Sequence, residues 1–218
     1  MKPITVILAS LVVLAPATAA SAAKPPKPPK GTPALSASAT PFVVTFGQST
    51  TVAGRLTGNN HGGQRVTLAQ DPFPYGDGFL ALAQATTASN GGYSFRLLPT
   101  VNTNYRATSG QVTANTGVRV RHAVTLGVSD STPARGQLVR FFGSVRPKHD
   151  GKVVLIQRQA PSGGWSTVRR TKLLTATGNR SRFSTRLRVF SSRSYRARLT
   201  GDGQHLTGTS GSRALTVH

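Results

Sequence analysis

The residues with the clearest capacity for chemistry in this sequence are cationic. The chain of 218 residues holds 27 Lys and Arg against five acidic residues, all of them Asp, and its formal net charge is +22. The guanidinium group of Arg presents a planar fork of donors that fits phosphate, sulfate and carboxylate groups. The sequence therefore points to anionic ligands more than to a reaction.

These cations are concentrated in the second half of the chain. Residues 123–218 hold 17 Lys and Arg against three Asp, whereas residues 34–122 hold six Arg against two Asp. Several of the cations lie two residues apart, a step of roughly 7 Å along a strand, so they predict positive strips on strand faces. The predicted anion-binding residues are Arg169, Arg170, Lys172, Arg180, Arg182, Arg186, Arg188, Arg193, Arg196 and Arg198.

Catalytic groups are scarce by comparison. The chain has no Cys, which excludes thiol nucleophiles, disulfides and Cys-ligated zinc. It has no G-x-S-x-G nucleophile elbow, and so few carboxylates that a facing acidic pair is close to excluded. Asp130, Asp150 and Asp202 lie in polar turn sequences, which turn capping explains. We therefore predict that the protein is not an enzyme and uses no cofactor.

The sequence also predicts no metal site. The five histidines, at positions 61, 122, 149, 205 and 218, share no helical or hairpin ligand spacing, and we interpret them as exposed turn residues. The loop Asp71–Gly78 supplies only two carboxylates, whereas calcium takes six or more oxygen ligands. We interpret this loop as a Pro- and Gly-rich connection between strands, with Phe73 and Tyr75 partly exposed.

The N-terminal segment predicts export. Residues 1–22 combine Lys2, a short apolar run and a small-residue end, which is the pattern of a signal peptide for the general secretory route. Cleavage is expected after Ala22, with Ala19 as the alternative, and a retained membrane anchor is the less favoured reading. Residues 23–33 are rich in Pro and Lys and predict an extended linker. We expect a secreted or cell-wall-associated protein with no transmembrane segment after cleavage.

Self-comparison shows that residues 34–218 contain two copies of one unit. Gly47–Gly54 matches Gly136–Gly143, and later blocks recur in the same order at offsets of 88 to 90 residues. The other matching pairs are 64–68 with 152–156, 93–97 with 183–187, and 104–107 with 194–197, while 118–120 takes the same place at the end of the first unit as 215–217 in the second. We therefore predict one domain over residues 34–122 and a second, strongly basic domain over residues 123–218.

Alternating apolar and polar residues assign a face to each predicted strand. In the second unit Val139, Phe141 and Val145 alternate with polar residues, and Phe183 and Leu187 alternate with arginines. Short alternating runs every 8 to 12 residues are typical of a β-sandwich, because strands have a period of two. Burying the apolar set keeps unpaired guanidiniums out of the core. Trp165 and Phe79 follow Gly-rich turns in corresponding places and are predicted to fill the two cores.

Taken together, these blocks resemble the immunoglobulin-like repeats of secreted actinobacterial proteins. The resemblance rests on the opening strand Gly47–Gly54, the G-x-x-V-x-L strand Gly63–Leu68, the segment Asn90–Phe95 and the strand Thr103–Ala107. The second copy departs from the pattern, since residues 179–183 lack the glycine turn. The resemblance implies an all-β chain of two tandem immunoglobulin-like β-sandwich domains. It carries no catalytic motif, because such modules serve as spacers, adhesive domains or enzyme appendages.

The function that follows from these observations is non-catalytic adhesion. We expect a secreted or cell-envelope monomer whose basic second domain binds teichoic acid, acidic polysaccharide or extracellular DNA. Sequence-specific nucleic-acid binding is not expected, because no groove-fitting element or exposed aromatic residue among the cations is evident. The alternatives are a spacer whose charge serves solubility, a hydrolase with an unfamiliar site, and a membrane-active cationic protein, which the lack of an amphipathic helix disfavours.

Overall fold

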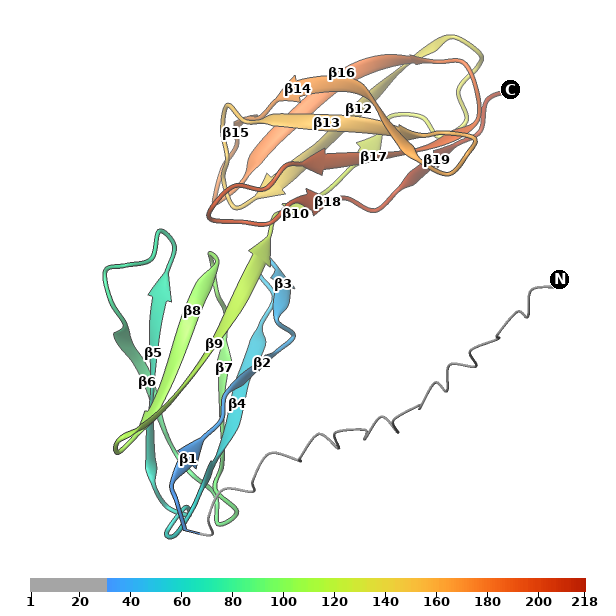
Figure 1. Cartoon of the computed structure of the whole chain (residues 1–218). Coiled ribbons are helices and arrows are strands. Elements are labelled where there is room, and N and C mark those ends of the chain that lie inside the picture. Colours follow the sequence, from blue (N-terminus) through green and yellow to red (C-terminus); the bar gives the residue numbers. More distant parts are fainter. Residues whose placement is uncertain (1–30) are drawn as a thin grey trace, which may run out of the picture. The chain divides into compact units, whose positions relative to one another are not determined.

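The computed structural model describes residues 31–218, and these form an all-β structure without helices in that range (Figure 1). The predicted signal peptide and most of the predicted linker lie outside the described residues. Two β-sandwiches follow one another along the chain. No helix among residues 31–218 has the length and apolar character that crossing a membrane requires.

The first sandwich consists of strands β1 to β9. One sheet holds β1 (Ala34–Leu35), β2 (Ser38–Thr40), β4 (Thr50–Thr57) and β7 (Gly92–Leu97). The other sheet has the order β3 (Val43–Thr45), β9 (Val112–Arg121), β8 (Thr103–Ser109), β5 (Arg65–Pro72) and β6 (Leu80–Thr86). All pairings are antiparallel except β3 with β9, which is parallel.

The second sandwich consists of strands β10 to β19. Its first sheet pairs β10 (Ala123–Val124) and β11 (Gly127–Val128) with β12 (Gln137–Arg146), then adds β16 (Ser181–Val189) and β15 (Leu174–Thr175). Its second sheet has the order β14 (Trp165–Lys172), β13 (Val153–Gln159) and β17 (Arg193–Leu199), and β17 pairs onward with β18 (Gly208–Thr209) and β19 (Arg213–Leu215).

This strand order is that of the immunoglobulin fold. In the second sandwich the sheet β10-β12-β16-β15 has the order A-B-E-D, and β13-β17-β19 has the order C-F-G. In the first sandwich β4 and β7 take the places of B and E, while β5, β8 and β9 take those of C, F and G. The topology therefore confirms the predicted fold class, two tandem immunoglobulin-like β-sandwiches.

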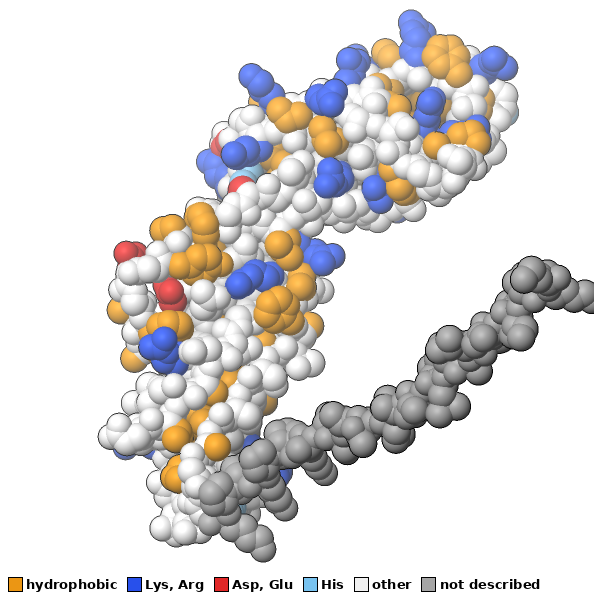
Figure 2. Space-filling model, viewed as in Figure 1, with side chains coloured by type: hydrophobic (Ala, Val, Ile, Leu, Met, Phe, Trp, Pro, Cys, Tyr) orange, Lys and Arg blue, Asp and Glu red, His pale blue; other side chains and the backbone are white. Residues whose placement is uncertain are grey.

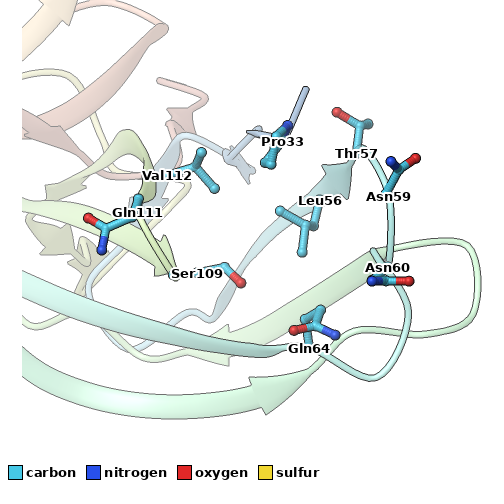
Figure 3. A pocket seen from close by; sticks show the side chains of 10 residues that line it. Pro33, Leu56, Thr57, Asn59, Asn60, Gln64, Ser109, Gln111 and Val112 are labelled. Carbon is cyan, nitrogen blue, oxygen red and sulfur yellow. The ribbon is translucent and has the colours of Figure 1, made fainter. Parts of the chain in front are cut away.

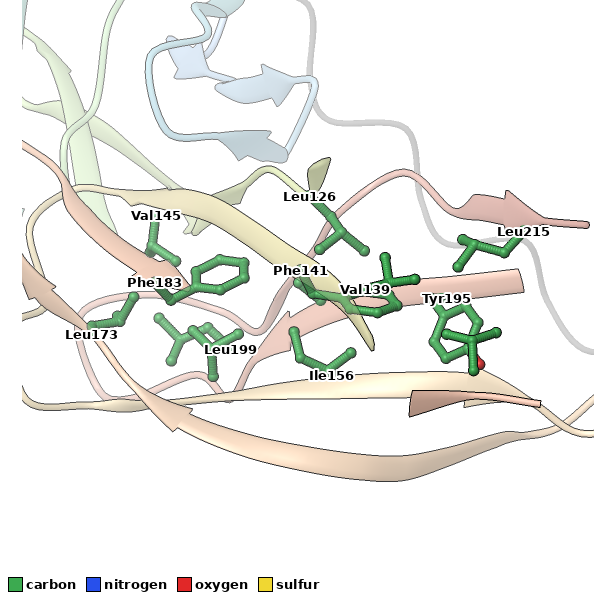
Figure 4. Close-up of a cluster of buried hydrophobic side chains, with 13 residues drawn as sticks. Leu126, Val139, Phe141, Val145, Ile156, Leu173, Phe183, Tyr195, Leu199 and Leu215 are labelled. Carbon is green, nitrogen blue, oxygen red and sulfur yellow. The ribbon is translucent and has the colours of Figure 1, made fainter. Parts of the chain in front are cut away.

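Each sandwich has its own hydrophobic core, and the alternation read from the sequence identifies most of both. Val139, Phe141, Val145 and Phe183 are buried between the sheets of the second sandwich (Figure 4). Arg182, Arg186 and Arg188 are exposed on the opposite side of β16, as the period of two predicts. The first core is built in the same way around Val52, Leu68 and Tyr105, among others.

The expectation for Phe79 and Trp165 is wrong. Both rings are only half-buried, and neither belongs to a core cluster. The guanidinium of Arg106 lies 4.0 Å from the centre of the Phe79 ring, and that of Arg196 lies 4.2 Å from the centre of Trp165. The two rings do correspond, but as supports for an arginine on β8 or β17, because a cation over an aromatic face is favourable.

The junction between the sandwiches is short. Strand β9 ends at Arg121 and β10 begins at Ala123, so His122 alone lies between them. The loop between β17 and β18 packs against this segment, since the amide N–H of Leu206 donates to the carbonyl of Val120 and Arg121 bridges to Leu206. The same loop meets Asn102 of the first sandwich, whose side-chain amide donates to the Gly203 carbonyl at 3.0 Å.

Candidate functional site

The first basic surface is the outer face of the sheet formed by β12 and β16. Arg140 on β12 lies directly opposite Arg186 on β16, and Arg182 and Arg188 extend the same row along β16. Like charges that face each other across strands repel, so this face carries unbalanced positive charge. We call Arg140, Arg182, Arg186 and Arg188 the β16 face.

The second basic surface is the outer face of the other sheet. Arg170 on β14 and Arg198 on β17 flank Leu155 of β13 in one cross-strand row. Lys172 and Arg196 lie two residues along their own strands and therefore share this face. Arg196 stacks on Trp165 and donates through Nε to Gln157 Oε1 at 2.9 Å. We call Arg170, Lys172, Arg196 and Arg198 the β17 face.

The remaining predicted cations lie at edges and turns. Arg169 reaches from the edge strand β14 to the other sheet, where it donates to the Arg186 carbonyl at 3.1 Å. Arg180 donates to the Thr177 carbonyl in the turn before β16, and Arg193 donates to the Ser192 carbonyl at the start of β17. The ten predicted residues therefore belong to two opposite faces and their edges instead of one pocket.

The positive charge of these faces is not neutralised by carboxylates. Within residues 31–218 the only Lys or Arg that forms an ion pair is Lys148, 3.1 Å from Asp150. Space-filling atoms show the same distribution, with Lys and Arg side chains spread over the second sandwich and few acidic groups near them (Figure 2). Burial, and after it the charge of Arg198, lowers the pKa of Arg196.

Two of the three aspartates of the second sandwich, Asp130 and Asp202, cap turns as predicted, whereas Asp150 instead bonds to strands β15 and β16. Asp130 Oδ1 accepts the amide N–H of Thr132, and Asp202 Oδ1 accepts those of Gln204 and His205. Asp150 accepts the hydroxyls of Ser181 and Thr175, which in that order lower its pKa.

Aromatic and aliphatic side chains are exposed among the cations, contrary to the expectation from sequence. Phe142, which is 37% exposed, lies beside Arg140, with the guanidinium 4.8 Å from the ring centre. Phe190, Leu138 and Leu174 are also exposed on or beside the same sheet. Leu138, Phe142 and Leu174 lie at outward positions of their strands, and Phe190 follows the end of β16.

A hollow at one end of the first sandwich carries no charged group in its lining. It has a volume of about 420 Å³ and lies between Pro33, Leu56 and Val112, with the amide side chains of Asn59, Asn60, Gln64 and Gln111 around it (Figure 3). Acid–base chemistry needs a titratable group near the reacting atoms, and this lining provides none.

The interpretation of the histidines as exposed turn residues is wrong for three of the five, since the His149 side chain is also only 9% exposed. His122 and His205 are each 1% exposed, and they meet His149 and Asp202 beside the junction. The four residues come from three separate segments, so no local spacing signals the cluster. Only the immunoglobulin topology, which brings the β12–β13 and β17–β18 loops to the same end as strand β10, joins them.

The environment keeps the buried imidazoles neutral. Burial, and after it the neighbouring histidines, lowers the pKa of His122 to about 4, against a smaller opposing effect of Asp202. Burial also lowers the pKa of His205, although its hydrogen bond to the Thr100 carbonyl opposes this. Burial by itself would raise the pKa of Asp202, but the His205 amide and the nearby imidazoles bring it below its ordinary value.

Comparison with known proteins adds little to this picture. No protein-family model matches the chain, and no curated protein is similar to it. Among solved structures, the chain is similar to the ectodomain of the polymeric immunoglobulin receptor of a teleost fish. The identity is 11% and the TM-score is 0.35, over 83% of this chain and 97% of the receptor chain. The fold assignment therefore rests on the strand order described above.

Proposed function

We propose that this chain is a non-catalytic, secreted or cell-envelope immunoglobulin-like protein of the actinobacterial type, which adheres to anionic polymers through its second sandwich. The observation that carries the proposal is the pair of basic faces, where arginines lie opposite or beside one another without carboxylate partners. Repulsion within each face is relieved when a polyanion places phosphate, sulfate or carboxylate groups between the guanidiniums. Export rests on the sequence of residues 1–22.

The arrangement on two faces favours adhesion over selective recognition. A single concave site would orient one ligand, whereas charge on both sides of a sandwich attracts a long polymer in many registers. Teichoic acid, acidic polysaccharide and extracellular DNA all offer this repeated charge. The exposed Phe142 ring, already stacked by Arg140, adds an apolar contact for a sugar or base without selecting its sequence.

The test is retention on immobilised heparin and on a phosphate resin. Three variants are tested. The first carries both Arg182→Ser and Arg186→Ser, the second carries both Arg170→Ser and Arg198→Ser, and the third carries all four substitutions. The matched control removes two exposed arginines from the first sandwich, Arg55→Ser with Arg96→Ser.

Each double variant of the second sandwich should elute at lower salt than the control, and the quadruple variant at the lowest salt. The slope of log affinity against log salt should fall by about one for each phosphate contact that is lost. If the control loses as much retention as the second-sandwich variants, the charge acts only through the net total, and the spacer interpretation replaces adhesion.

A further inference from the structure

Four potential ligand side chains converge beside the junction between the sandwiches. His122 follows β9, His149 lies in the β12–β13 loop, and Asp202 and His205 lie in the β17–β18 loop. One nitrogen or oxygen from each of the four lies within 4.8 Å of the others. The centre of the His122 ring lies 4.4 Å from the centre of the His149 ring and 4.9 Å from that of the His205 ring.

The hydrogen bonds of His149 leave this cluster short of positive charge. Its Nδ1 lies 3.1 Å from the Pro147 carbonyl oxygen, and its Nε2 lies 3.2 Å from Asp202 Oδ2. Both partners are acceptors, whereas a neutral imidazole has a single N–H to donate. A neutral ring therefore leaves one of its nitrogens facing an acceptor lone pair, and either a second proton or a cation bound at Nε2 supplies the missing positive charge.

The rings of His205 and His122 also have nitrogens without a hydrogen-bond partner. The Nε2 of His205 is 2.8 Å from the Thr100 carbonyl oxygen and must be its donor, which leaves Nδ1 as a lone pair 3.8 Å from Asp202 Oδ1. Both ring nitrogens of His122 lack a hydrogen-bond partner. Within residues 31–218 the only buried side-chain polar atoms without partners are these two and His205 Nδ1. Buried polar atoms are paired in the great majority of cases, so three orphans at one point indicate a missing ligand.

The surroundings hold the ligands in place. Asp202 Oδ1 accepts the amide N–H groups of Gln204 at 3.0 Å and His205 at 2.8 Å, which fixes the carboxylate and leaves Oδ2 free to face His149. The carbonyls of Pro147 and Thr100 orient the rings of His149 and His205. Such second partners of ligating residues are typical of metal sites, since they set the tautomer of each imidazole.

We propose that His122, His149, Asp202 and His205 bind one divalent transition-metal ion of the zinc class. Imidazole nitrogen and carboxylate oxygen are both zinc ligands, and three of the first with one of the second complete a four-coordinate site. Zinc–nitrogen bonds of about 2.0–2.1 Å place tetrahedral ligands about 3.4 Å apart. The separation of 3.2 Å between His149 Nε2 and Asp202 Oδ2 is close to this value, and the four ligand atoms together lie within 4.8 Å of one another. Calcium and magnesium do not fit, because both take mainly oxygen ligands.

The ion has a route to the site and a structural consequence. His149 and Asp202 also line a shallow hollow on the β17 face, together with Arg170 and Leu155, so the cluster opens to solvent on one side. Once bound, the ion joins the residue after β9 to two loops of the second sandwich. His205 remains bonded to Thr100 of the first sandwich, so the ion also strengthens that polar contact.

The experiment uses the untagged full chain, because a polyhistidine tag would bind zinc itself. After chelator treatment and dialysis, the protein is titrated with zinc chloride by calorimetry and with cobalt chloride by visible absorption. We expect one zinc per chain, the intense visible bands of tetrahedral cobalt, displacement of cobalt by zinc, and a thermal midpoint raised by about 5 °C at saturating zinc. Calcium chloride should produce none of these effects.

The variants locate the site. His149→Gln should weaken zinc binding at least tenfold, whereas the matched control His61→Gln, whose ring is bonded to the Gly58 carbonyl in the first sandwich, should leave binding unchanged. Absence of zinc uptake by the unaltered chain, equal affinity of the His149→Gln variant, or loss of binding in the His61→Gln variant would overturn the proposal. A weak octahedral cobalt spectrum of the unaltered chain would overturn the proposal as well. This readout does not depend on whether the His149→Gln variant folds.

Discussion

Tyr93 and Phe183 occupy the same place in the two copies, and a single hydroxyl group separates their environments. The Tyr93 hydroxyl donates to the Ser36 carbonyl and lies close to Gly54, where a side chain would collide with both. Phe183 has no such hydroxyl, and its ring packs directly against Gly143. Each copy therefore needs glycine at the same strand position, and only the first carries a buried titratable group there.

Tyr93 makes the first sandwich sensitive to alkali. Burial raises the pKa of Tyr93 to about 12, while the unfolded chain ionises it near 10. Between these values the unfolded state has released its proton and the folded state has not, so stability present below pH 10 is lost as the pH rises towards 12. Tyr93→Phe should remove about 1 kcal/mol of the stability lost between pH 9 and pH 11, measured by urea unfolding at both values, and an unchanged pH dependence would contradict it.

Gly143 is predicted to tolerate no side chain. An added Cβ would lie 2.7 Å from the Phe183 ring and would collide with the Thr125 carbonyl. Gly143→Ala should therefore lower the stability of the second sandwich by about 1–3 kcal/mol through overpacking. The measurement is a thermal melt with Gly164→Ala as control, because a Cβ at Gly164 meets nothing within 4 Å. Equal thermal midpoints of the two variants would show that the strands can move apart around the added methyl group without loss of stability.

The sequence reveals burial at this scale but not chemistry between distant residues. Alternation places Phe141 inward and Arg140 outward because a guanidinium without a partner is costly to bury. The same reasoning assigns His122 and His205 to exposed turns, since neither lies in a local ligand pattern. Their burial arises from loops that meet only once the sheets are paired. Trp165 is misplaced for a related reason, because the pattern cannot tell an aromatic ring in the core from one beneath an arginine.

At the scale of the elements, the pairing of β12 with β16 places two arginines opposite each other, and their repulsion lowers the stability of the sheet. Nine residue pairs align these strands, and the fourth of them places Arg140 opposite Arg186. Cross-strand like charges destabilise a sheet, whereas opposite charges stabilise it by about 0.2–1 kcal/mol. Retaining two arginines at this position makes sense if the face binds anions, and this interpretation gives the next prediction.

Arg186→Glu should have opposite effects on stability and on adhesion. The new carboxylate faces Arg140, so the second sandwich should gain about 0.2–1 kcal/mol at low salt, and the gain should shrink as salt screens the pair. Retention on heparin should fall in the same variant. Arg135→Glu changes the net charge equally but lies in a loop before β12, so it should give no comparable gain. A destabilised Arg186→Glu variant would contradict the argument.

At the scale of the whole molecule, the repeat in the sequence anticipates the division into two sandwiches. Blocks such as 47–54 and 136–143 recur because each copy needs the same opening strand and the same close approach at Gly54 and Gly143. The positive strips predicted from the sequence lie on both sides of the second sandwich, because β16 and β17 belong to different sheets. The cluster of side chains around His122 could not be anticipated, because it depends on contacts between loops far apart in the chain.

The two core clusters share no residue, so we expect the domains at 34–122 and 123–218 to unfold separately when the metal is absent. Trp165 is the only tryptophan in the chain and lies on β14, so its fluorescence reports on the second sandwich alone. Phe141→Ala should cost about 3–5 kcal/mol and move the fluorescence transition. Leu68→Ala should cost the first sandwich about 2–5 kcal/mol. It should shift the unfolding of the first sandwich, which circular dichroism detects, and leave the fluorescence transition unchanged. Coincident shifts of both signals in both variants would show that the polar contacts around Asn102 and His205 join the sandwiches into one cooperative unit.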